Sequence, residues 1–228
     1  MRCTAVIAAR NEAAAIADVV RDCLAHADEV IVVDDGSCDA TASRAAAAGA
    51  RVLSLAPSGG KGHAIRRGAA LAHADVLVFL DGDGQDPASE IPRLVAAIDR
   101  GADLAIGSRF RGTFEPGAIA ALDHVGNRAL TALFGLLYRR RVTDSQAGFK
   151  AIRRATFERL QLRADGFDIE AELLARAIVQ GAAIVEVPVT RRARVEGRSR
   201  LRRVPDGLRI LARMVEVRIS GARRSAPC

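Results

Sequence analysis

The sequence predicts an α/β protein built on a mostly parallel central sheet with helices on both faces. Two observations predict this fold class. Short β-branched apolar runs alternate with alanine-rich helical stretches over the first two thirds of the chain, and each run ends in a polar or glycine-rich turn. This alternation is typical of parallel strands joined by crossover helices. The 228 residues, half of them hydrophobic, are enough for one large domain with a continuous core.

The elements can be placed along the chain from the same pattern. Five strands are expected in the regular part, at residues 4–8, 29–33, 51–55, 75–80 and 103–106. Four helices are expected there, at residues 13–26, 41–48, 62–73 and 88–100. The regularity fades after residue 111, where we expect only helices at 122–138 and 169–180, a loop at 143–148 and a strand at 183–187.

The segments that follow the five expected strands are all polar, small or charged. They read ARNE (9–12), DDGS (34–37), SGGKG (58–62), DGDGQ (81–85) and GSRF (107–110). In an open α/β sheet, ligands bind beyond the carboxyl ends of the strands. The active site is therefore expected where these five segments meet.

Asp81 and Asp83 end the most apolar run in the chain, VLVFL (76–80). Two carboxylates one residue apart, on a turn that leaves a buried strand, can share a hard cation that in turn binds phosphate oxygens. The alternative is that Asp and Gly simply form a turn, which is the commoner explanation for an isolated DxD. The polar and charged residues at the neighbouring strand ends favour a metal site over a simple turn.

The other strand ends add binding groups, each with a structural alternative. Asp34 and Asp35 are suited to accept hydrogen bonds from a base or a ribose, although Asp-Gly also makes turns. Lys61 lies in a glycine-rich loop before a helix, where it can approach a phosphate, although the loop does not match the Walker pattern. Arg109 offers a bidentate partner for phosphate, or else is an ordinary surface arginine.

The positive charge belongs to the end of the chain. From residue 188 onward there are twelve arginines and three acidic residues, a net charge of +9, whereas residues 1–187 carry −2 of the total of +7. Nucleic-acid binding is not expected, because aromatic residues are scarce and the arginines lie in one segment. A phosphate-bearing substrate or an anionic membrane surface fits better.

Apolar residues recur at helical spacing in this basic segment, at Leu208, Leu211, Val215 and Ile219. An interfacial amphipathic helix and a helix packed on the core both fit this spacing. The four cysteines are widely spaced and predict neither a zinc site nor a disulfide framework. No run is long and apolar enough to span a bilayer and the start is unlike a signal peptide, so we expect a cytoplasmic protein.

Ten motifs follow one another along the chain: ARNE, VIVVDDGS, GGKG, FLDGDGQ, GSRF, GN (126–127), TDSQAGF, GFDIE, EVPV and RVEGRSRL. Taken together in this order, they resemble glycosyltransferase family 2, in its dolichol-phosphate mannose synthase and polyprenyl-phosphate glycosyltransferase branch. The resemblance covers residues 4–201. It implies a GT-A fold, in which a Rossmann-like nucleotide-binding half is merged with an acceptor half.

The resemblance also implies roles for individual residues. Mg²⁺ or Mn²⁺ would be held on the donor diphosphate by Asp81, Asp83 and Gln85. The donor nucleotide would be bound by Glu12, Asp34, Asp35, Lys61 and Asp81. Phosphates on the acceptor side would be bound by Arg128, Ser145, Arg198 and Arg202, and the residues expected to act most directly in catalysis are Asp83, Arg109 and Arg200.

The expected activity is therefore inverting transfer of a hexose, mannose or glucose, from a GDP- or UDP-sugar to a polyprenyl or dolichyl phosphate. The alternatives are transfer to a saccharide or small hydroxyl acceptor, with Asp168 or Glu170 as base, and a noncatalytic nucleotide-sugar binder. We expect a catalytic domain at residues 1–200 and a basic amphipathic segment at 201–228. The expected location is the cytoplasmic face of a membrane, with peripheral contact only. One departure is GRSR at 197–200, where the family often has Gly-X-Ser-Lys.

Overall fold

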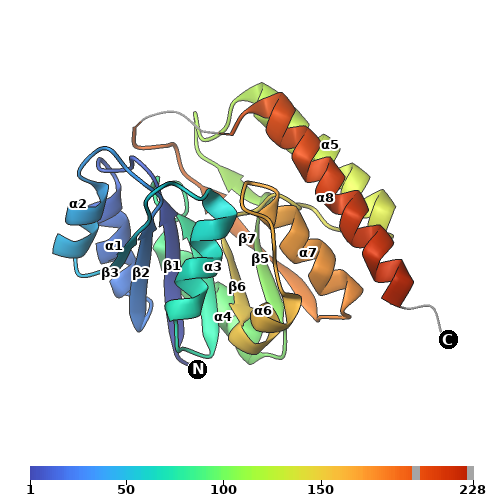
Figure 1. The fold of residues 1–228 in the computed structure, drawn as a ribbon, viewed down its shortest axis with the longest axis horizontal. Coiled ribbons are helices and arrows are strands. Elements are labelled where there is room, and N and C mark those ends of the chain that lie inside the picture. The colour runs from blue at the N-terminus through green and yellow to red at the C-terminus, as the bar shows by residue number, and fades with distance from the viewer. Residues whose placement is uncertain (197–200, 225–228) are drawn as a thin grey trace.

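The computed structural model describes residues 1–196 and 201–224, with side chains up to residue 220. A seven-stranded sheet runs through the centre, in the order β3-β2-β1-β4-β6-β5-β7 (Figure 1). All neighbouring strands are parallel except β6 (Lys150–Arg153), which runs antiparallel to both of its neighbours. The predicted fold class is confirmed.

The first half of the sheet follows the alternation seen in the sequence. Its strands are β1 (Cys3–Ala9), β2 (Glu29–Asp34), β3 (Arg51–Ser54) and β4 (Val76–Asp81). Its helices are α1 (Ile16–Leu24), α2 (Thr41–Ala47) and α3 (Lys61–Leu71). β1 and β4 are buried along almost their whole length, so their carboxyl ends are fixed from both faces.

The second half departs from strict alternation. After the short η1 (Ala88–Glu90) it contains α4 (Ile91–Asp99), β5 (Leu104–Phe114), α5 (Ala121–Tyr138), β6, α6 (Arg154–Leu160), α7 (Ile169–Val179), β7 (Ile184–Arg191) and α8 (Arg203–Arg224). The sequence prediction missed β6 and α6, because a four-residue strand that leads directly into a helix shows neither periodicity clearly. It also ended the strands at Ile106 and Val187, although β5 and β7 continue as a partly exposed pair to Phe114 and Arg191.

Two hydrophobic clusters cover the two faces of the sheet. One contains buried residues of α1 and α4, including Ile16, Val20 and Leu94. The other contains buried residues of α3, α6 and α7, and extends to α5 and α8 through Phe134 and Met214. Helices therefore lie on both faces, as predicted.

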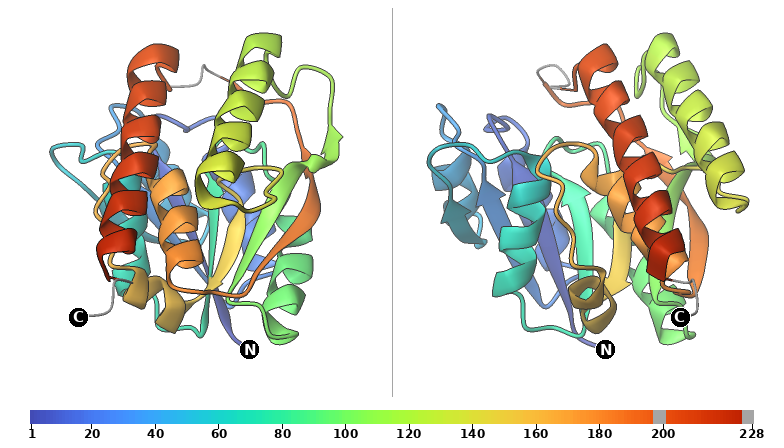
Figure 2. Two further views of the ribbon diagram at one scale, coloured as in Figure 1. Left: turned by 90° about the vertical axis from the view of Figure 1, so that its right-hand side faces the viewer. Right: turned by 45° about the vertical axis from the view of Figure 1, so that its right-hand side comes forward.

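Helix α8 both packs on the domain and leaves an apolar face outside. Its inner face buries Ile210, Met214 and Val217 in the core. Of the apolar stripe predicted from the sequence, Leu211 packs partly against the core, whereas Leu208, Val215 and Ile219 point outward, with Leu208 62% and Ile219 52% exposed. Helices α5 and α8 lie side by side and project beyond the sheet (Figures 1 and 2). In the described part of the chain, no helix has the length and hydropathy required to cross a bilayer.

Candidate active site

Four acidic side chains gather at the carboxyl ends of β1 and β4, and we refer to Glu12, Asp81, Asp83 and Asp86 as the carboxylate cluster. Register places Ala8 of β1 opposite Asp81 of β4, so the turns after the two strands emerge together. Asp83 and Asp86 are 2% and 5% exposed. Burial of several carboxylates at one point is costly unless cations or a metal neutralise them.

Asp81 is neutralised from α3. Lys61 Nζ lies 2.6 Å from Asp81 Oδ1 and 3.0 Å from Glu170 Oε1. Glu170 in turn lies 2.5 Å from Lys150 Nζ through its other oxygen, and both of these side chains are buried. The result is a chain of alternating charges, Lys150–Glu170–Lys61–Asp81, that runs from β6 and α7 to the end of β4.

The loop that precedes β6 closes over this pair. A Cβ atom at Gly148 would lie 3.1 Å from Lys61 Nζ and 3.2 Å from Asp81 Oδ2. A side chain at this position would therefore crowd the ion pair. The glycine of the TDSQAGF motif lets the loop backbone approach the carboxylate closely.

Two arginines at the end of β7 neutralise the rest of the cluster. Arg191 Nη1 lies 2.5 Å from Asp86 Oδ1, and its Nη2 donates to Gln85 Oε1 over 2.9 Å. Arg194 Nη2 lies 2.6 Å from Asp83 Oδ2, and its Nη1 lies 3.2 Å from Glu12 Oε1. One guanidinium thus bridges the loops that follow β1 and β4.

These contacts shift the pKa values of the cluster in different directions. Burial would raise the pKa of Asp81, but Lys61 and the two arginines outweigh burial and lower it to about 2. Burial, and then repulsion from Asp81, raises the pKa of Asp83. Burial also raises the pKa of Glu12, against the attraction of Arg194. Asp81 is therefore firmly ionised, whereas Asp83 and Glu12 bind a proton more readily than ordinary carboxyl groups do.

The predicted nucleoside ligands Asp34 and Asp35 lie at the end of β2 and are both buried. Asp35 accepts hydrogen bonds from the Gly59 and Gly60 N–H groups, at 2.7 and 3.0 Å, and from Ser58 Oγ. It therefore fixes the loop that leads into α3. Asp34 accepts a hydrogen bond from the Ser37 hydroxyl. Their contact with a nucleoside stays a prediction.

Gln85 and Lys61 have protein partners that the sequence did not predict. Gln85 Nε2 donates to the carbonyls of Ala118 and Arg192, over 2.9 and 3.0 Å, and so ties the chain after β7 to the cluster. Lys61, predicted to contact a phosphate, neutralises Asp81 and Glu170. Metal binding by Gln85 and phosphate binding by Lys61 stay predictions.

Two of the predicted acceptor residues, Arg128 and Ser145, lie after β5, whereas Arg109, predicted to act in catalysis, lies within β5. Arg109 forms a bidentate pair with the buried Asp144, with Nε–Oδ2 and Nη2–Oδ1 distances of 2.7 and 2.8 Å. Ser145 is buried and pairs with the Thr131 hydroxyl of α5 at 3.0 Å. Arg128 is exposed, with its guanidinium 5.7 Å from the centre of the Phe110 ring. Of these three, Arg128 is the one that the fold leaves accessible.

The remaining predicted cations belong to the basic segment. Arg202 is exposed just before α8, and its N–H donates to Asp206 Oδ2 over 2.7 Å. Arg198 and Arg200 lie outside the described residues. The predicted role of Arg198 at the acceptor phosphate and that of Arg200 in catalysis stay predictions.

The cluster fits a divalent ion that takes part of its coordination from a ligand. Over residues 1–196 and 201–224, no three His, Cys, Asp or Glu side chains form a group that would hold a metal by themselves. Asp81 and Asp83 supply hard oxygen donors at a strand end, and Mg²⁺ is commonly bound by one or two carboxylates together with substrate phosphates. Metal dependence itself remains a prediction.

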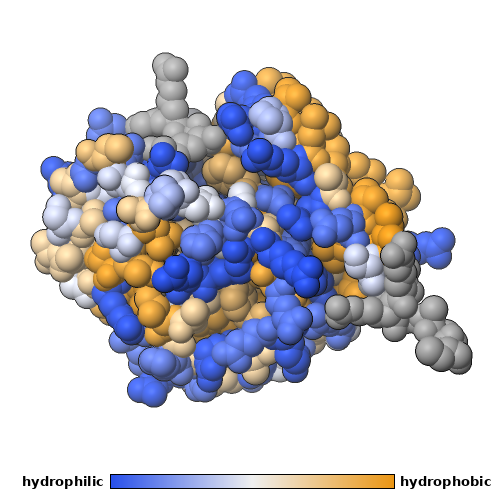
Figure 3. All heavy atoms as spheres, viewed as in Figure 1, coloured by the Kyte–Doolittle hydropathy of each residue, from blue (hydrophilic) through white to orange (hydrophobic). Residues whose placement is uncertain are grey.

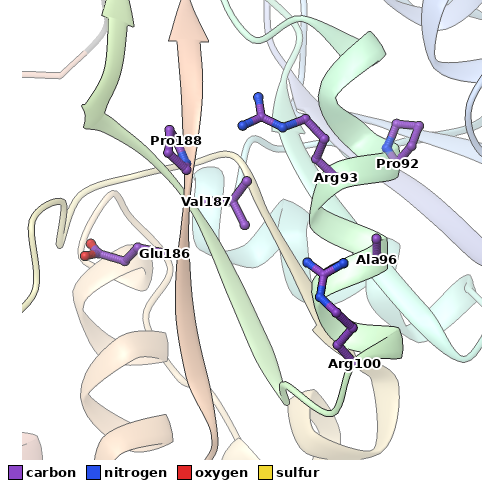
Figure 4. Close-up of a pocket in the computed structure, with 7 residues that line it drawn as sticks. All are labelled: Pro92, Arg93, Ala96, Arg100, Glu186, Val187 and Pro188. Atoms are coloured by element: carbon purple, nitrogen blue, oxygen red, sulfur yellow. The ribbon is translucent and has the colours of Figure 1, made fainter.

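A separate hollow lies along the outer strand of the sheet, between α4 and β7 (Figure 4). It is lined by Pro92, Arg93, Ala96, Arg100, Glu186, Val187 and Pro188. In Figure 4, Glu186 points to the opposite side of β7 from Val187. The hollow shares no residue with the carboxylate cluster, and we assign it no role.

Sequence reasoning missed several residues that build the site. Arg191 and Arg194 were assigned to a basic tail, because the last strand was expected to end at Val187. A longer strand would have placed both at a strand end, where ligands bind. Lys150 carried a usable signal, since it and Lys61 are the two lysines among 34 basic residues. Asp144, the partner of Arg109, gave no comparable signal.

Solved structures share this architecture. Glucosyl-3-phosphoglycerate synthase from Mycobacterium tuberculosis, in complex with phosphoglyceric acid, matches with a TM-score of 0.75 and 26% identity over 95% of this chain and 79% of that one. The same enzyme in complex with Mn²⁺, UDP and glucosyl-3-phosphoglycerate matches with a TM-score of 0.74 and 26% identity over the same shares of both chains. The fold is the GT-A fold of glycosyltransferases.

Sequence comparison gives the family. The model described as "Glycosyl transferase family 2" matches residues 4–161, and the chain belongs to this family. Glycosyltransferase AglJ of Haloferax volcanii is 36% identical over 82% of this chain and 62% of its own length. Dolichol-phosphate mannosyltransferase of Pyrococcus furiosus is 34% identical over 76% and 51%, and polyprenol monophosphomannose synthase of Mycolicibacterium smegmatis is 34% identical over 75% and 69%. The chain thus spans only about half to two thirds of the length of several curated relatives.

Proposed function

We propose that this glycosyltransferase moves a hexose from a GDP- or UDP-sugar to a polyprenyl phosphate, with inversion at the anomeric carbon and with Mg²⁺ or Mn²⁺. The observation that carries the proposal is the position of the carboxylate cluster. Asp81 and Asp83 stand at the end of β4, and Arg128 is exposed on α5. The names of the relatives in Pyrococcus and Mycolicibacterium support this acceptor class.

Each group has a place in this reaction. Asp81 and Asp83 would hold the metal, which when bound neutralises charge on the departing nucleoside diphosphate. Arg128 and Arg202 are exposed cations suited to the phosphate of the acceptor. Asp34, Asp35 and Glu12 would contact the nucleoside.

The acceptor needs no general base in this scheme. The second pKa of a phosphate monoester is about 6, so the attacking oxygen is already anionic near neutral pH. The protein has to hold this oxygen in line with the anomeric carbon. Asp168 and Glu170, the bases of the alternative acceptor class, are both paired: Asp168 with Arg213 at 3.0 Å and Glu170 with two lysines. Burial would raise the pKa of Glu170, but Lys150 and Lys61 lower it, which makes this carboxylate a weak base.

The proposal includes peripheral contact with an anionic membrane through α5 and α8. Large apolar side chains stand exposed on both helices: Leu122, Val125, Leu133 and Leu136 on α5, and Val204, Leu208, Val215 and Ile219 on α8. Figure 3 shows hydrophobic residues in a band along this helix pair. Arg209 and Arg218 are exposed on the same α8, next to this band. Apolar side chains flanked by arginines are typical of helices that lie in a membrane interface.

The test is transfer of label into an organic phase. The protein is incubated with labelled GDP- and UDP-sugars and Mg²⁺ or Mn²⁺, with polyprenyl phosphate, polyprenol or phosphoglyceric acid as acceptor. We expect extractable label only with polyprenyl phosphate. Label in a water-soluble product with phosphoglyceric acid would assign the enzyme to a small phosphorylated acceptor. Donor binding without turnover on any acceptor would indicate a noncatalytic binder.

A further inference from the structure

Arg194 holds a position that a metal ion at Asp83 would need. Its Nη2 lies 2.6 Å from Asp83 Oδ2, while Asp83 Oδ1 accepts a hydrogen bond from the Gln85 N–H over 3.0 Å. Asp83 is 2% exposed, so its two oxygens have little room for further partners. A divalent ion would bind this carboxylate oxygen at about 2.0 to 2.6 Å. A guanidinium and a divalent ion cannot share the oxygen at these distances without strong repulsion.

The segment that carries Arg194 is anchored through the backbone of Arg192. A metal at Asp83 would leave these backbone contacts intact. The Arg192 N–H donates to the Gln85 carbonyl over 2.9 Å, and the Arg192 carbonyl accepts from Gln85 Nε2 over 3.0 Å. Two residues further on, Arg194 is held by Asp83 and Glu12. Val195 follows and lies against Gly84, where an added Cβ atom would be 3.0 Å from Val195 Cγ2. The Ala193 N–H also donates to Glu115 Oε2 over 3.3 Å, so movement of the Arg194 side chain requires no change before Ala193.

We propose that Arg194 is an internal counter-ion that competes with the divalent metal for Asp83, so that metal binding releases the Arg194 side chain from the carboxylate cluster. This inference rests on the proposed metal site at Asp81 and Asp83. Without metal, Arg194 bridges Glu12 and Asp83 and closes the donor side. With metal, the same arginine is freed beside the bound diphosphate, where a cation is useful. The apparent affinity for metal is thereby reduced by the pairing that the metal has to break.

The experiment measures binding of Mn²⁺ alone, from the decrease of the electron paramagnetic resonance signal of free Mn²⁺. The full chain is compared with the Arg194→Gln variant. The control is Arg192→Gln, which removes one positive charge from the same segment at an exposed position. We expect Mn²⁺ to bind Arg194→Gln at least about fivefold more tightly than the wild-type protein, and Arg192→Gln to bind like wild type.

Equal Mn²⁺ affinity of the wild-type protein and Arg194→Gln would overturn the proposal. An equal gain in Mn²⁺ affinity in Arg192→Gln would also overturn it, because the effect would then come from net charge alone. Asp83→Asn distinguishes this failure from failure of the metal site itself. If Mn²⁺ binds the wild-type protein but not Asp83→Asn, the metal site is supported independently of the result for Arg194→Gln. If Mn²⁺ binds none of the proteins, the metal site is wrong and the inference falls with it. Arg194→Lys keeps the charge and, if Arg194→Gln does not fold, is expected to show a smaller tightening for the same reason.

Discussion

Charged side chains are paired differently in the two halves of the sheet. In the half formed by β1 to β4, buried carboxylates are already neutralised by Lys61, Arg191 and Arg194. On the side formed by β5, α5 and α8, Arg109 and Arg213 pair with the buried Asp144 and Asp168, whereas Arg128 and Arg202 stand exposed. The comparison teaches that the first side is assembled before any ligand arrives, whereas the second also presents exposed cations. The predictions below test this difference, from the largest expected effect to the smallest.

Removing the charge of Asp83 should have the largest effect on transfer. In Asp83→Asn, we expect the rate of sugar transfer to fall at least about a hundredfold, because the leaving diphosphate loses its metal anchor. The fold should persist, since Arg191 and Arg194 lose only one of their acidic partners. The control is Asp99→Asn, an exposed carboxylate paired with the N-terminus at 3.9 Å. Full activity of Asp83→Asn would contradict the metal assignment.

Breaking the buried charge chain should cost stability. In Glu170→Gln, Lys150 loses its carboxylate and Lys61 keeps only Asp81, so the free energy of unfolding should fall by about 3 kcal/mol. For a chain of this size, that corresponds to a decrease in Tm of roughly 6 to 12 °C. Glu158→Gln removes the exposed pair with Arg154 and should cost less than about 1 kcal/mol. Equal losses of stability in Glu170→Gln and Glu158→Gln would mean that the buried charge chain stabilises the fold no more than an exposed ion pair.

The same variant should show how this stabilisation depends on pH. The lysines lower the pKa of Glu170 in the folded protein, and the unfolded value is about 4.3. Its contribution is therefore fully present above the unfolded pKa, and is lost as the pH falls through the lower folded pKa. Urea unfolding of wild type and Glu170→Gln should give the same stability difference at about pH 7 and 5.5, and a smaller one at about pH 3.5. A difference that grows as the pH falls would contradict the sign of the shift.

Arg128 should affect the acceptor and not the donor. In Arg128→Gln, we expect KM for polyprenyl phosphate to rise about tenfold with little change in KM for the nucleotide sugar, because one exposed charge-assisted contact is lost. The matched control is Arg140→Gln, an exposed arginine just beyond the C-terminal end of α5. A rise in the KM for the nucleotide sugar instead would indicate that Arg128 binds the donor and not the acceptor.

The apolar face of α5 and α8 should have the smallest effect, confined to membrane binding. The double variant Leu136→Asp and Leu208→Asp replaces side chains that are 77% and 62% exposed, so the fold should be unaffected. We expect sedimentation with vesicles that contain anionic lipid to fall several-fold. Val179→Asp and Val185→Asp, which replace exposed residues of α7 and β7, serve as the control. Equal sedimentation of all three proteins would remove the membrane role from this face.

How much the sequence predicted also differs between the two halves. From β1 to β4, strand, turn and helix repeat locally, so the sheet and the positions of Asp81 and Asp83 followed from the pattern. In the other half, β6 pairs antiparallel between β4 and β5, which are far from it in the chain, and this pairing leaves no local signal. The partner of Arg109 and the bridging of Glu12 and Asp83 by Arg194 depend on the same long-range pairing. They are properties of the assembled sheet and not of any one segment.

The central claim is that Asp81 and Asp83 form a metal-dependent site for the donor diphosphate. Calorimetric titration with UDP and with GDP, each with and without Mn²⁺, tests it most directly. We expect at least one of the two nucleotides to bind about tenfold more tightly with Mn²⁺ in the wild-type protein, and this gain to vanish in Asp83→Asn. Nucleotide binding that is equally tight without metal, or a gain that survives in Asp83→Asn, would contradict the account.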